Sequence, residues 1–274
     1  MSQPPTVALI ISTFEQPDYL RRVLDAVSRQ SRLPEELLLA DDGSGDETKE
    51  VFFQWSSRQP FSGRHVWQQH DGFRKAHVLN RAVAAANSSY LVFLDGDMVP
   101  HREFVADHCA AARPAAFIQG HRALVEQKAA VWFGRRELTA DRRRALWQRQ
   151  LSGWKNAWRW PVPVVSEKNH LRGVRGCNLS LWRADMLRVN GYDEAFTGWG
   201  REDSEFAARL MNAGVRRLDL RGRALCFHLW HPPASRVQLS ANDGRLEKTI
   251  REKITRCEHG LDRHRSADAS GVSQ

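Results

Sequence analysis

The chain has 274 residues, with 41 Lys and Arg against 32 Asp and Glu, and its net charge of +9 favours anionic partners such as a nucleotide, a membrane surface or a phosphorylated glycan. No apolar run approaches the ~20 residues of a membrane span, and the opening MSQPPTVALIIS lacks the basic start and long apolar core of a secretory signal. We therefore expect a cytoplasmic protein with one compact unit and an appendage. The four cysteines have neither paired nor finger-like spacing and are expected to be free thiols.

Predicted strands and helices alternate through the first part of the chain. Apolar runs predict strands at 7–12, 37–40, 65–69 and 91–94, and helical spacing predicts helices at 18–30, 47–55 and 75–86. Strands that alternate with helices pair in parallel through right-handed crossovers. The predicted fold class is therefore α/β, with a doubly wound, mostly parallel sheet and a ligand crevice at the carboxyl ends of its strands.

The stretch LVFLDGDMV holds the most informative local pattern. Its apolar run fits a strand buried on both faces and stops at Asp95-Gly96-Asp97. Two carboxylates with a glycine between them offer hard oxygen ligands for a divalent cation and a diphosphate. Taken alone, the same three residues favour a surface turn, because Asp and Gly are the commonest turn residues. A second acidic pair, Asp41-Asp42, follows the strand at 37–40 and is expected at the same edge of the sheet.

Residues 131–160 differ from the rest of the chain. A helix at 102–112 and a strand at 116–125 precede this segment, which holds five of the ten Trp residues and eight basic residues against two acidic ones. Trp147, Leu151, Trp154 and Trp158 fall at helical spacing, which predicts one helix that ends at Pro161. Two interpretations stay open: the stripe lies at an anionic membrane interface, or it packs onto the sheet as ordinary core.

The last part of the chain is rich in glycine and in motifs. It reads RGCNLS, GYDEAFTGWGREDSEFAARL and CFHLWHPP, with a predicted helix at 204–211. A last helix is expected at 245–259, with Leu246, Ile250, Ile254 and Cys257 facing inward, followed by a disordered tail at 266–274. We expect a main domain at 1–240 and an appendage at 241–274.

Three motifs in order, ADDGS, FLDGDMVP and GWGREDSEFAARL, resemble family 2 glycosyltransferases of the GT-A fold. The segment NGYDEAFTGWGREDSEF, with the histidines after it, is similar to the galactosyltransferase-type half of bacterial chondroitin-type and lipopolysaccharide glycosyltransferases. The resemblance covers about residues 6–235. It implies a nucleotide-sugar-binding half at 6–100 and an acceptor-binding, catalytic half at 101–240 with a helical insertion at 131–161.

The resemblance also implies an inverting transfer from a nucleotide-diphosphate sugar, such as a UDP-sugar, to a glycan or a lipid-linked glycan. Such a reaction belongs to the synthesis of cell-surface polysaccharide or lipopolysaccharide. It would place the protein in the cytoplasm or peripherally on the inner face of the cytoplasmic membrane, and no nucleic acid is expected as a partner.

Several donor-site residues follow from the same resemblance. It puts the nucleoside between Ser12, Phe14 and Asp42, the ribose near Asp95, and the diphosphate against Arg74 and Lys75. Asp97 would bind a divalent metal together with a histidine, for which His228 and His231 are both candidates. Carboxylate, phosphate and imidazole ligands suit Mn²⁺ better than Mg²⁺, although both stay open.

The acceptor side is expected around Glu202 and Asp203. Acidic residues are favoured in the first turn of any helix, so one of the pair needs no catalytic explanation. The resemblance points to Asp203 as the general base and to Glu202 as a hydrogen-bond partner of the acceptor, with Trp199 and Asn178 also on the acceptor side. Trp199 either stacks on a sugar or packs in the core.

Two other functions use some of the same features. A nucleotidyltransferase shares the architecture and the acidic metal site, but it should carry a glycine-rich basic loop after the first strand, and here that loop is STFEQPD. A basic nucleic-acid-binding protein would account for the charge and for the Trp and Arg residues. The sequence contains no recognised nucleic-acid module.

Overall fold

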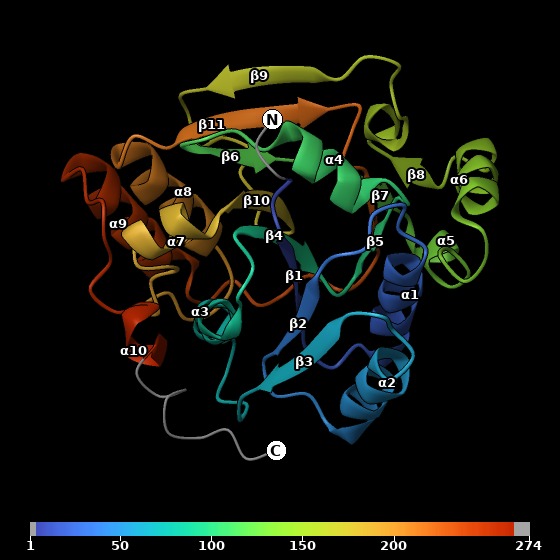
Figure 1. The fold of residues 1–274 in the computed structure, drawn as a ribbon, viewed down its shortest axis with the longest axis horizontal. Coiled ribbons are helices and arrows are strands. Elements are labelled where there is room, and N and C mark those ends of the chain that lie inside the picture. The colour runs from blue at the N-terminus through green and yellow to red at the C-terminus, as the bar shows by residue number, and fades with distance from the viewer. Residues whose placement is uncertain (1–3, 266–274) are drawn as a thin grey trace.

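The computed structural model describes residues 4–265, which form two sheets and the helices around them (Figure 1). The large sheet has eight strands in the order β3 (Ser62–Trp67), β2 (Glu36–Asp41), β1 (Val7–Thr13), β4 (Tyr90–Asp95), β10 (Asn178–Trp182), β6 (Ala116–Gln119), β11 (Arg216–Arg221) and β9 (Val164–Lys168). A smaller sheet has the order β5 (Met98–Pro100), β12 (Cys226–Leu229), β7 (Arg122–Val125) and β8 (Leu151–Ser152).

Helices cover both faces of the large sheet (Figure 1). One apolar layer contains α1 (Pro17–Ser28), α2 (Asp46–Ser56), α4 (Phe104–Ala111), α5 (Gln127–Ala130) and α6 (Leu138–Trp147) together with the small sheet. The other contains α3 (Lys75–Ala85), α7 (Arg183–Arg188) and α8 (Glu202–Asn212), with α9 (Leu239–Arg251) and α10 (Asp262–Arg265) on the same side. The predicted α/β class with a doubly wound sheet is confirmed.

The parallel half of the sheet forms as the sequence pattern predicts. The apolar runs of β1 and β4 are buried on both faces, and the two strands pair in parallel with Ser12 opposite Asp95. Because parallel strands end at one edge, this register brings the polar residues that follow each run together. The amphipathic helices α1 and α3 connect the strands and bury Leu20, Val23 and Val78 against opposite faces.

The second half of the fold departs from a simple parallel sheet. Strand β10 lies antiparallel between β4 and β6, and β9 is an antiparallel edge strand beside β11. The strand expected at 116–125 is two strands in different sheets, because the chain turns at Gly120 and His121. A Cβ on Gly120 would lie 2.1 Å from Oδ1 of Asn178, so only glycine allows that turn to pack there.

The prediction of one helix that carries Trp147 to Trp158 and ends at Pro161 is wrong. Helix α6 ends at Trp147, and the chain then forms β8 and a short 3₁₀ helix, η1 (Trp154–Ala157). Arg149 and Gly153 have φ values of 55° and 67°, which an α-helix does not accommodate. The core interpretation fails for three of the tryptophans, since the exposed fractions of Trp147, Trp154 and Trp158 are 84%, 55% and 41%.

The C-terminal helix, α9, begins and ends earlier than expected, and of the four residues predicted to face inward only Cys257, which lies beyond the end of α9, is buried. In α9 the buried residues are Asn242 and Thr249, whereas Ile250 is 41% exposed. Asn242 Nδ2 donates to the carbonyl oxygens of Gly200 (2.9 Å) and Thr197 (3.2 Å), so polar contacts to the chain before α8 fix this helix. The expected boundary at 240 falls inside α9, and the tail at 266–274 lies outside the described residues.

All four cysteines are free thiols, as expected. Within residues 4–265, the structure contains no helix with the length and apolar character that crossing a membrane requires.

Candidate functional site

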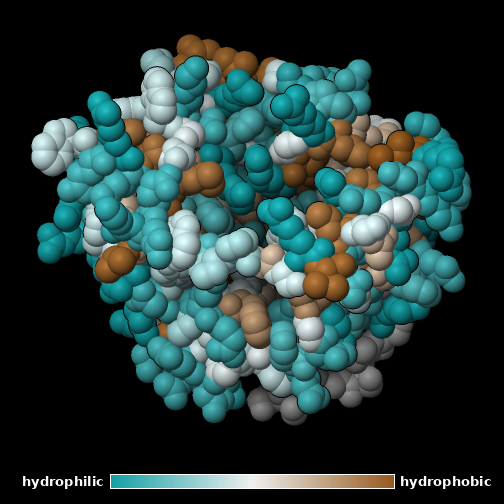
Figure 2. Space-filling view, turned by 180° about the vertical axis from the view of Figure 1, so that it is seen from behind, coloured by the Kyte–Doolittle hydropathy of each residue, from teal (hydrophilic) through white to brown (hydrophobic). Residues whose placement is uncertain are grey.

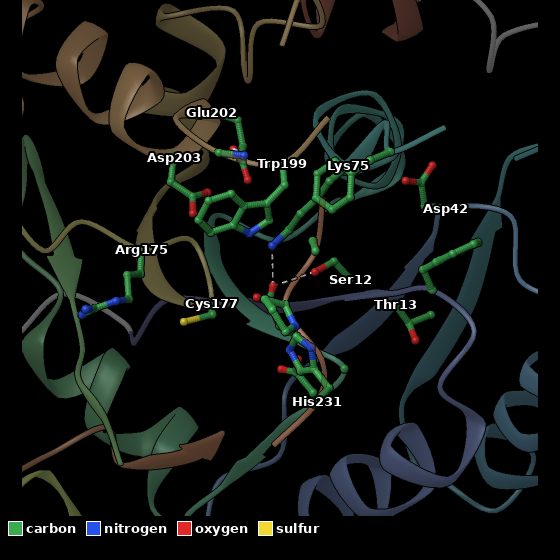
Figure 3. A pocket seen from close by; sticks show the side chains of 18 of the residues that line it. Ser12, Thr13, Asp42, Lys75, Arg175, Cys177, Trp199, Glu202, Asp203 and His231 are labelled. Atoms are coloured by element: carbon green, nitrogen blue, oxygen red, sulfur yellow. Dashed lines mark hydrogen bonds and ion pairs between the residues drawn. The ribbon is translucent and has the colours of Figure 1, made fainter. Parts of the chain in front are cut away.

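A cavity of about 780 Å³ opens where the carboxyl ends of β1 and β4 meet the loops around α8 and β12. Seen from behind the view of Figure 1, this side of the molecule is mostly hydrophilic and hollowed near its middle (Figure 2). Figure 3 shows that the side chains in the cavity come from distant parts of the chain, with Lys75 between the carboxylates of α8 and His231. Both halves of the sequence therefore build one site.

Asp95 at the end of β4 anchors the cavity floor. Its Oδ1 accepts hydrogen bonds from Ser12 Oγ at 2.7 Å and from Lys75 Nζ at 2.6 Å. Burial alone lowers the pKa of Lys75, but the charges of Asp95, Asp203 and Glu202 raise it well above its ordinary value. The ammonium of Lys75 is therefore a fixed positive charge in the middle of the cavity.

Gly96 brings the next carboxylate into position. A Cβ there would lie 3.0 Å from Oγ1 of Thr13 and 3.1 Å from the carbonyl oxygen of Ser12, so glycine allows the loop to pack against β1. Strand β12 pairs with β5 so that His228 is opposite Met98, and the amide of Leu229 donates to the carbonyl oxygen of Asp97 at 2.9 Å. This pairing sets the histidine beside Asp97.

Asp97, His228 and His231 form a compact cluster, with their ligand atoms all within 4.8 Å of one another. Oδ2 of Asp97 lies 2.9 Å from Nε2 of His231 and 3.5 Å from Nε2 of His228. Burial alone raises the pKa of Asp97, but hydrogen bonds from the two histidines lower it far below its usual range. Its Oδ1 is buried, and no group among the described residues donates to it.

The second carboxylate pair begins α8. Gly198, Gly200 and Arg201 have φ values of 71°, 109° and 75°, and this left-handed stretch turns the chain into the helix. Burial and the adjacent Asp203 raise the pKa of Glu202 to about 7, and Glu202 Oε2 accepts a hydrogen bond from the amide of Gly200 at 3.0 Å. The carboxyl group of Glu202 therefore has a pKa in the range where protons are exchanged near neutral pH.

Asp203 is the less buried of the two residues: Glu202 is 8% exposed, whereas Asp203 is half-buried. Burial raises the pKa of Asp203 against the opposing charge of Lys75, and no described group donates to its buried Oδ1. A Cβ at position 176 would lie 2.2 Å from that oxygen, so Gly176 is needed to seat the carboxylate. The carboxylate lines the cavity, where it can accept a hydrogen bond from a hydroxyl group.

The far end of the cavity is formed by the loop after β1 and by Asp42. The ring of Phe14 is 42% exposed and stacks on His70, with ring centroids 4.4 Å apart. Asp42 is buried and accepts from Gln68 Nε2 at 2.5 Å and from the amide of Arg74 at 2.8 Å. Burial also raises the pKa of Asp42. A half-exposed aromatic face beside a fixed carboxylate suits a planar polar ring.

The cavity brings together most of the residues expected there. The lining includes Ser12, Phe14, Asp42, Lys75, Asp95, Asp97, Trp199, Glu202, Asp203, His228 and His231. Trp199 is 39% exposed and Arg236 lies over its ring at 5.4 Å, so it is not a core residue.

Two expected residues lie outside the lining. The Arg74 guanidinium turns away and donates to the carbonyl oxygen of Gln69 at 2.8 Å. Asn178 is 1% exposed, and its amide nitrogen donates to the carbonyl oxygens of His121 and Ala224, both at 2.9 Å. Asn178 therefore links neighbouring strands, and it does not line the cavity in which the acceptor was expected to contact it.

Sequence reasoning missed the arginines of the lining. Arg122, Arg175, Arg201 and Arg236 all border the cavity. The arginines come from β7, from the loop before β10, from the left-handed turn before α8 and from the loop before α9. No local pattern marks them among the many arginines of this chain, because their position depends on how the second half of the fold packs.

The Asp97 cluster fits a divalent cation. Two imidazoles and one carboxylate are an accepted ligand set for Mn²⁺ or Zn²⁺, and the Nδ1 of His231 lies 2.8 Å from the carbonyl oxygen of Pro232, which directs Nε2 toward Asp97. The buried Oδ1 of Asp97 without a donor is the kind of group that a cation satisfies.

The fold defines a class of protein. TarS from *S. aureus* superposes with a TM-score of 0.64 at 13% identity over 94% of this chain and 41% of its own. A mannosyltransferase from *Pyrobaculum calidifontis*, solved with GDP-Man and Mn²⁺, superposes with a TM-score of 0.57 at 16% identity over 100% of this chain and 77% of its own. The architecture is thus that of the GT-A glycosyltransferases.

The sequence comparisons name the family. The family model "Glycosyl transferase family 2" matches residues 8–169, and "N-terminal domain of galactosyltransferase" matches 162–232. The chain belongs to glycosyl transferase family 2, as its motifs predict.

The relatives are longer than this chain. Validoxylamine A glucosyltransferase from *Streptomyces hygroscopicus* subsp. *limoneus* is 29% identical over 242 residues, which cover 78% of this chain and 49% of the relative. Chondroitin synthase from *Escherichia coli* is 23% identical over 238 residues, or 81% of this chain and 34% of the relative. The chain therefore spans between about a third and a half of these relatives.

Proposed function

We propose that this chain catalyses an inverting, metal-dependent transfer of a sugar from a nucleotide-diphosphate sugar to a hydroxyl of a glycan or a lipid-linked glycan. One observation carries the proposal. The Asp97–His228–His231 cluster and the Asp203 carboxylate line one cavity, with the Lys75 ammonium between them. A donor sugar placed between these groups would have its leaving group at the cluster and its acceptor at Asp203.

The donor half of the cavity has groups suited to a nucleoside diphosphate. The ring of Phe14 and the carboxylate of Asp42 would hold the base, and Asp95, tied to Ser12 and Lys75, would lie at the ribose. The guanidinium groups of Arg122 and Arg175 add positive charge for the phosphates. A UDP-sugar is our first choice of donor.

Asp97, with His228 and His231, would hold Mn²⁺ or Mg²⁺. The bound cation would neutralise the charge that develops on the departing diphosphate. The two histidines keep Asp97 ionised, and β5–β12 pairing keeps the carboxylate and both imidazoles on the same wall of the cavity. The softer imidazole ligands favour Mn²⁺ over Mg²⁺.

Asp203 is our candidate for the general base. Its carboxylate, which lines the cavity, would accept the proton of the acceptor hydroxyl as the hydroxyl oxygen attacks the anomeric carbon from the side opposite the diphosphate. Glu202 would bind another acceptor hydroxyl, and the exposed ring of Trp199 would stack on the acceptor sugar. Since a single displacement needs one base, no covalent intermediate on the protein is required.

The exposed tryptophans outside the cavity support a peripheral contact with an anionic membrane. Trp147 and Trp154 are more than half exposed, and the guanidinium of Arg142 lies 4.9 Å from the ring centroid of Trp158. Aromatic rings next to basic side chains suit the headgroup region of an anionic bilayer. A lipid-linked acceptor would be presented at that surface, as in lipopolysaccharide synthesis.

The test is turnover of a panel of nucleotide sugars by the purified chain, with and without EDTA. Transfer or hydrolysis of one donor, lost in EDTA and restored by Mn²⁺, supports the proposal. Metal-independent turnover, or transfer of the nucleotidyl group in place of the sugar, overturns it. If Asp97→Ala binds the nucleotide with unchanged affinity in the presence of Mn²⁺, Asp97 is not a ligand of the metal.

A further inference from the structure

We propose that His77, Glu194 and His264 form a second metal site, for a transition cation such as Zn²⁺, that fastens α10 to α3. The three residues come from α3, from the loop before α8 and from α10, and their ligand atoms all lie within 4.8 Å of one another. Nε2 of His264 is 2.6 Å from Oε1 of Glu194, and the two imidazole rings are 4.9 Å apart. None of these residues lines the donor cavity.

The imidazole of His77 is held in the tautomer that a ligand needs. Its Nδ1 lies 2.6 Å from Oε1 of Gln68, and the amide of Gln68 is itself oriented because its Nε2 donates to the Asp42 carboxylate at 2.5 Å. An amide oxygen only accepts, so Nδ1 carries the hydrogen and Nε2 keeps its lone pair.

Glu194 is oriented by a second buried amide. Asn80 is fully buried, and its Nδ2 donates to Oε1 of Glu194 at 2.9 Å and to the carbonyl oxygen of Tyr192 at 2.8 Å. The amide of Tyr192 donates back to Oδ1 of Asn80 at 2.8 Å, which fixes the orientation of that side chain. Metal-binding histidines and carboxylates usually have such partners behind them, and both are present here.

The segment that carries His264 is placed without the help of a cation. Backbone amides bind it to the loop of Glu194: the amide of Leu261 donates to the carbonyl oxygen of Asn190 at 2.9 Å, and the amide of Glu194 donates to that of His259 at 2.9 Å. A Cβ on Gly260 would lie 2.0 Å from the same Asn190 oxygen, so the contact is tight. The histidine is therefore held near its two partners beforehand.

The side chains of this cluster indicate which class of cation it would bind. Two imidazoles and one carboxylate leave a fourth position for water and suit Zn²⁺ and neighbouring transition metals, whereas Ca²⁺ and Mg²⁺ prefer oxygen ligands. The ligand atoms of His264 and Glu194 are already in contact, so a bound cation would separate them slightly and replace their hydrogen bond.

The experiment uses the full chain with Asp97→Ala and His231→Ala, so that the cavity cluster no longer binds metal. We expect this background variant to bind one Zn²⁺ per chain by equilibrium dialysis and to melt at a higher temperature with Zn²⁺. Adding His77→Ala or Glu194→Gln should weaken Zn²⁺ binding by at least ~100-fold and remove the shift in melting temperature. His170→Ala, which removes an exposed histidine far from the cluster in sequence, is the matched control and should change neither.

Two results would overturn the proposal: a background variant that binds no Zn²⁺, or Zn²⁺ binding that His77→Ala and His264→Ala both leave intact while circular dichroism shows folded protein. The cluster would then be a hydrogen-bonded pair with a neighbouring histidine. Because binding and melting are measured without turnover, the result is independent of the proposed transferase activity.

Discussion

Two clusters in this molecule contain the same side chains, two histidines and one carboxylate, in different surroundings. Oε1 of Glu194 accepts from both Asn80 and His264, so its contacts are complete. Oδ1 of Asp97 is buried beside the cavity and has no donor among the described residues. The comparison teaches that ligand types alone do not separate a structural site from a reactive one. The unsatisfied oxygen beside open space marks the site where a substrate or a cation is exchanged.

The largest expected effect distinguishes the role of the Asp97 carboxylate from that of the Glu194 carboxylate. Asp97→Ala should reduce kcat by at least ~10³-fold, because a cation at the leaving group supplies several kcal/mol of stabilisation. Glu194→Gln should instead destabilise the fold by ~1–3 kcal/mol, since it weakens charge-assisted hydrogen bonds. Steady-state kinetics measures the loss of turnover, and urea unfolding measures the loss of stability, for both variants. Wild-type turnover of Asp97→Ala in EDTA would contradict the proposed role of Asp97.

The next effect concerns the acceptor side of the cavity. Asp203→Asn keeps the shape of the side chain but removes the base, and should lower kcat by ~10²-fold or more with little change in donor affinity. Nucleotide affinity measured by calorimetry serves as the control for folding. Undiminished kcat would remove Asp203 as the base.

A smaller effect tests whether both histidines of the cavity cluster bind the metal. His231 lies closer to Asp97 than His228 does, with Nε2 to Oδ2 distances of 2.9 and 3.5 Å. Single substitutions by alanine should each weaken Mn²⁺ binding by ~10-fold or more if both imidazoles are ligands. Electron paramagnetic resonance of Mn²⁺ titrations measures this, and two variants with wild-type affinity would exclude the histidines from the site.

The pH dependence of stability tests the environment of Glu202. Its pKa in the folded protein is about 7, above the ordinary 4.5, and Asp203, Lys75 and Asp95 are the charges that face it. The folded state therefore binds this proton more tightly, so the contribution of Glu202 to stability is complete below pH 4.5 and is lost as pH rises through about 7. Urea unfolding of Glu202→Gln in EDTA should lose this part of the pH dependence. An unchanged profile would contradict the raised pKa.

The smallest effect is expected outside both clusters, on the segment 147–158, where Trp147, Trp154 and Trp158 are exposed. If it contacts an anionic bilayer, reversing Arg143 and Arg144 to Glu should reduce sedimentation with phosphatidylserine vesicles by ~10-fold or more, because each basic residue near the surface contributes ~1 kcal/mol. The matched control variant replaces Arg245 and Arg251 on α9 with Glu, which should leave sedimentation with the vesicles unchanged. Equal loss in both variants would indicate a general effect of net charge.

The sequence predicted the parts of this molecule that depend on local patterns. Apolar runs and their polar ends were enough to place Asp95, Asp97 and Asp42 at one edge of a sheet, because parallel strands end together. Resemblance to a family added His228, His231 and Asp203, which lie more than a hundred residues away in the chain.

Other features depend on packing that no local pattern records. The helical spacing of residues 147–158 gives no sign that Arg149 and Gly153 adopt left-handed backbone conformations, which one continuous helix cannot contain. Asn178 resembles a polar site residue until its burial between strands is known. Arg122 and Arg175 reach the cavity only because β7 pairs with β12 in the small sheet and β10 pairs with β4 in the large one, so their role could not be predicted.

The most direct test of the central claim is the anomeric configuration of the product, read from the NMR coupling constant of its new linkage. The claim is that Asp203 and the Asp97 cluster act from opposite sides of one donor sugar in a single displacement. An α-linked nucleotide sugar should then give a β-linked product. An α-linked product would contradict the account, because retention requires a second displacement or attack from the side of the leaving group.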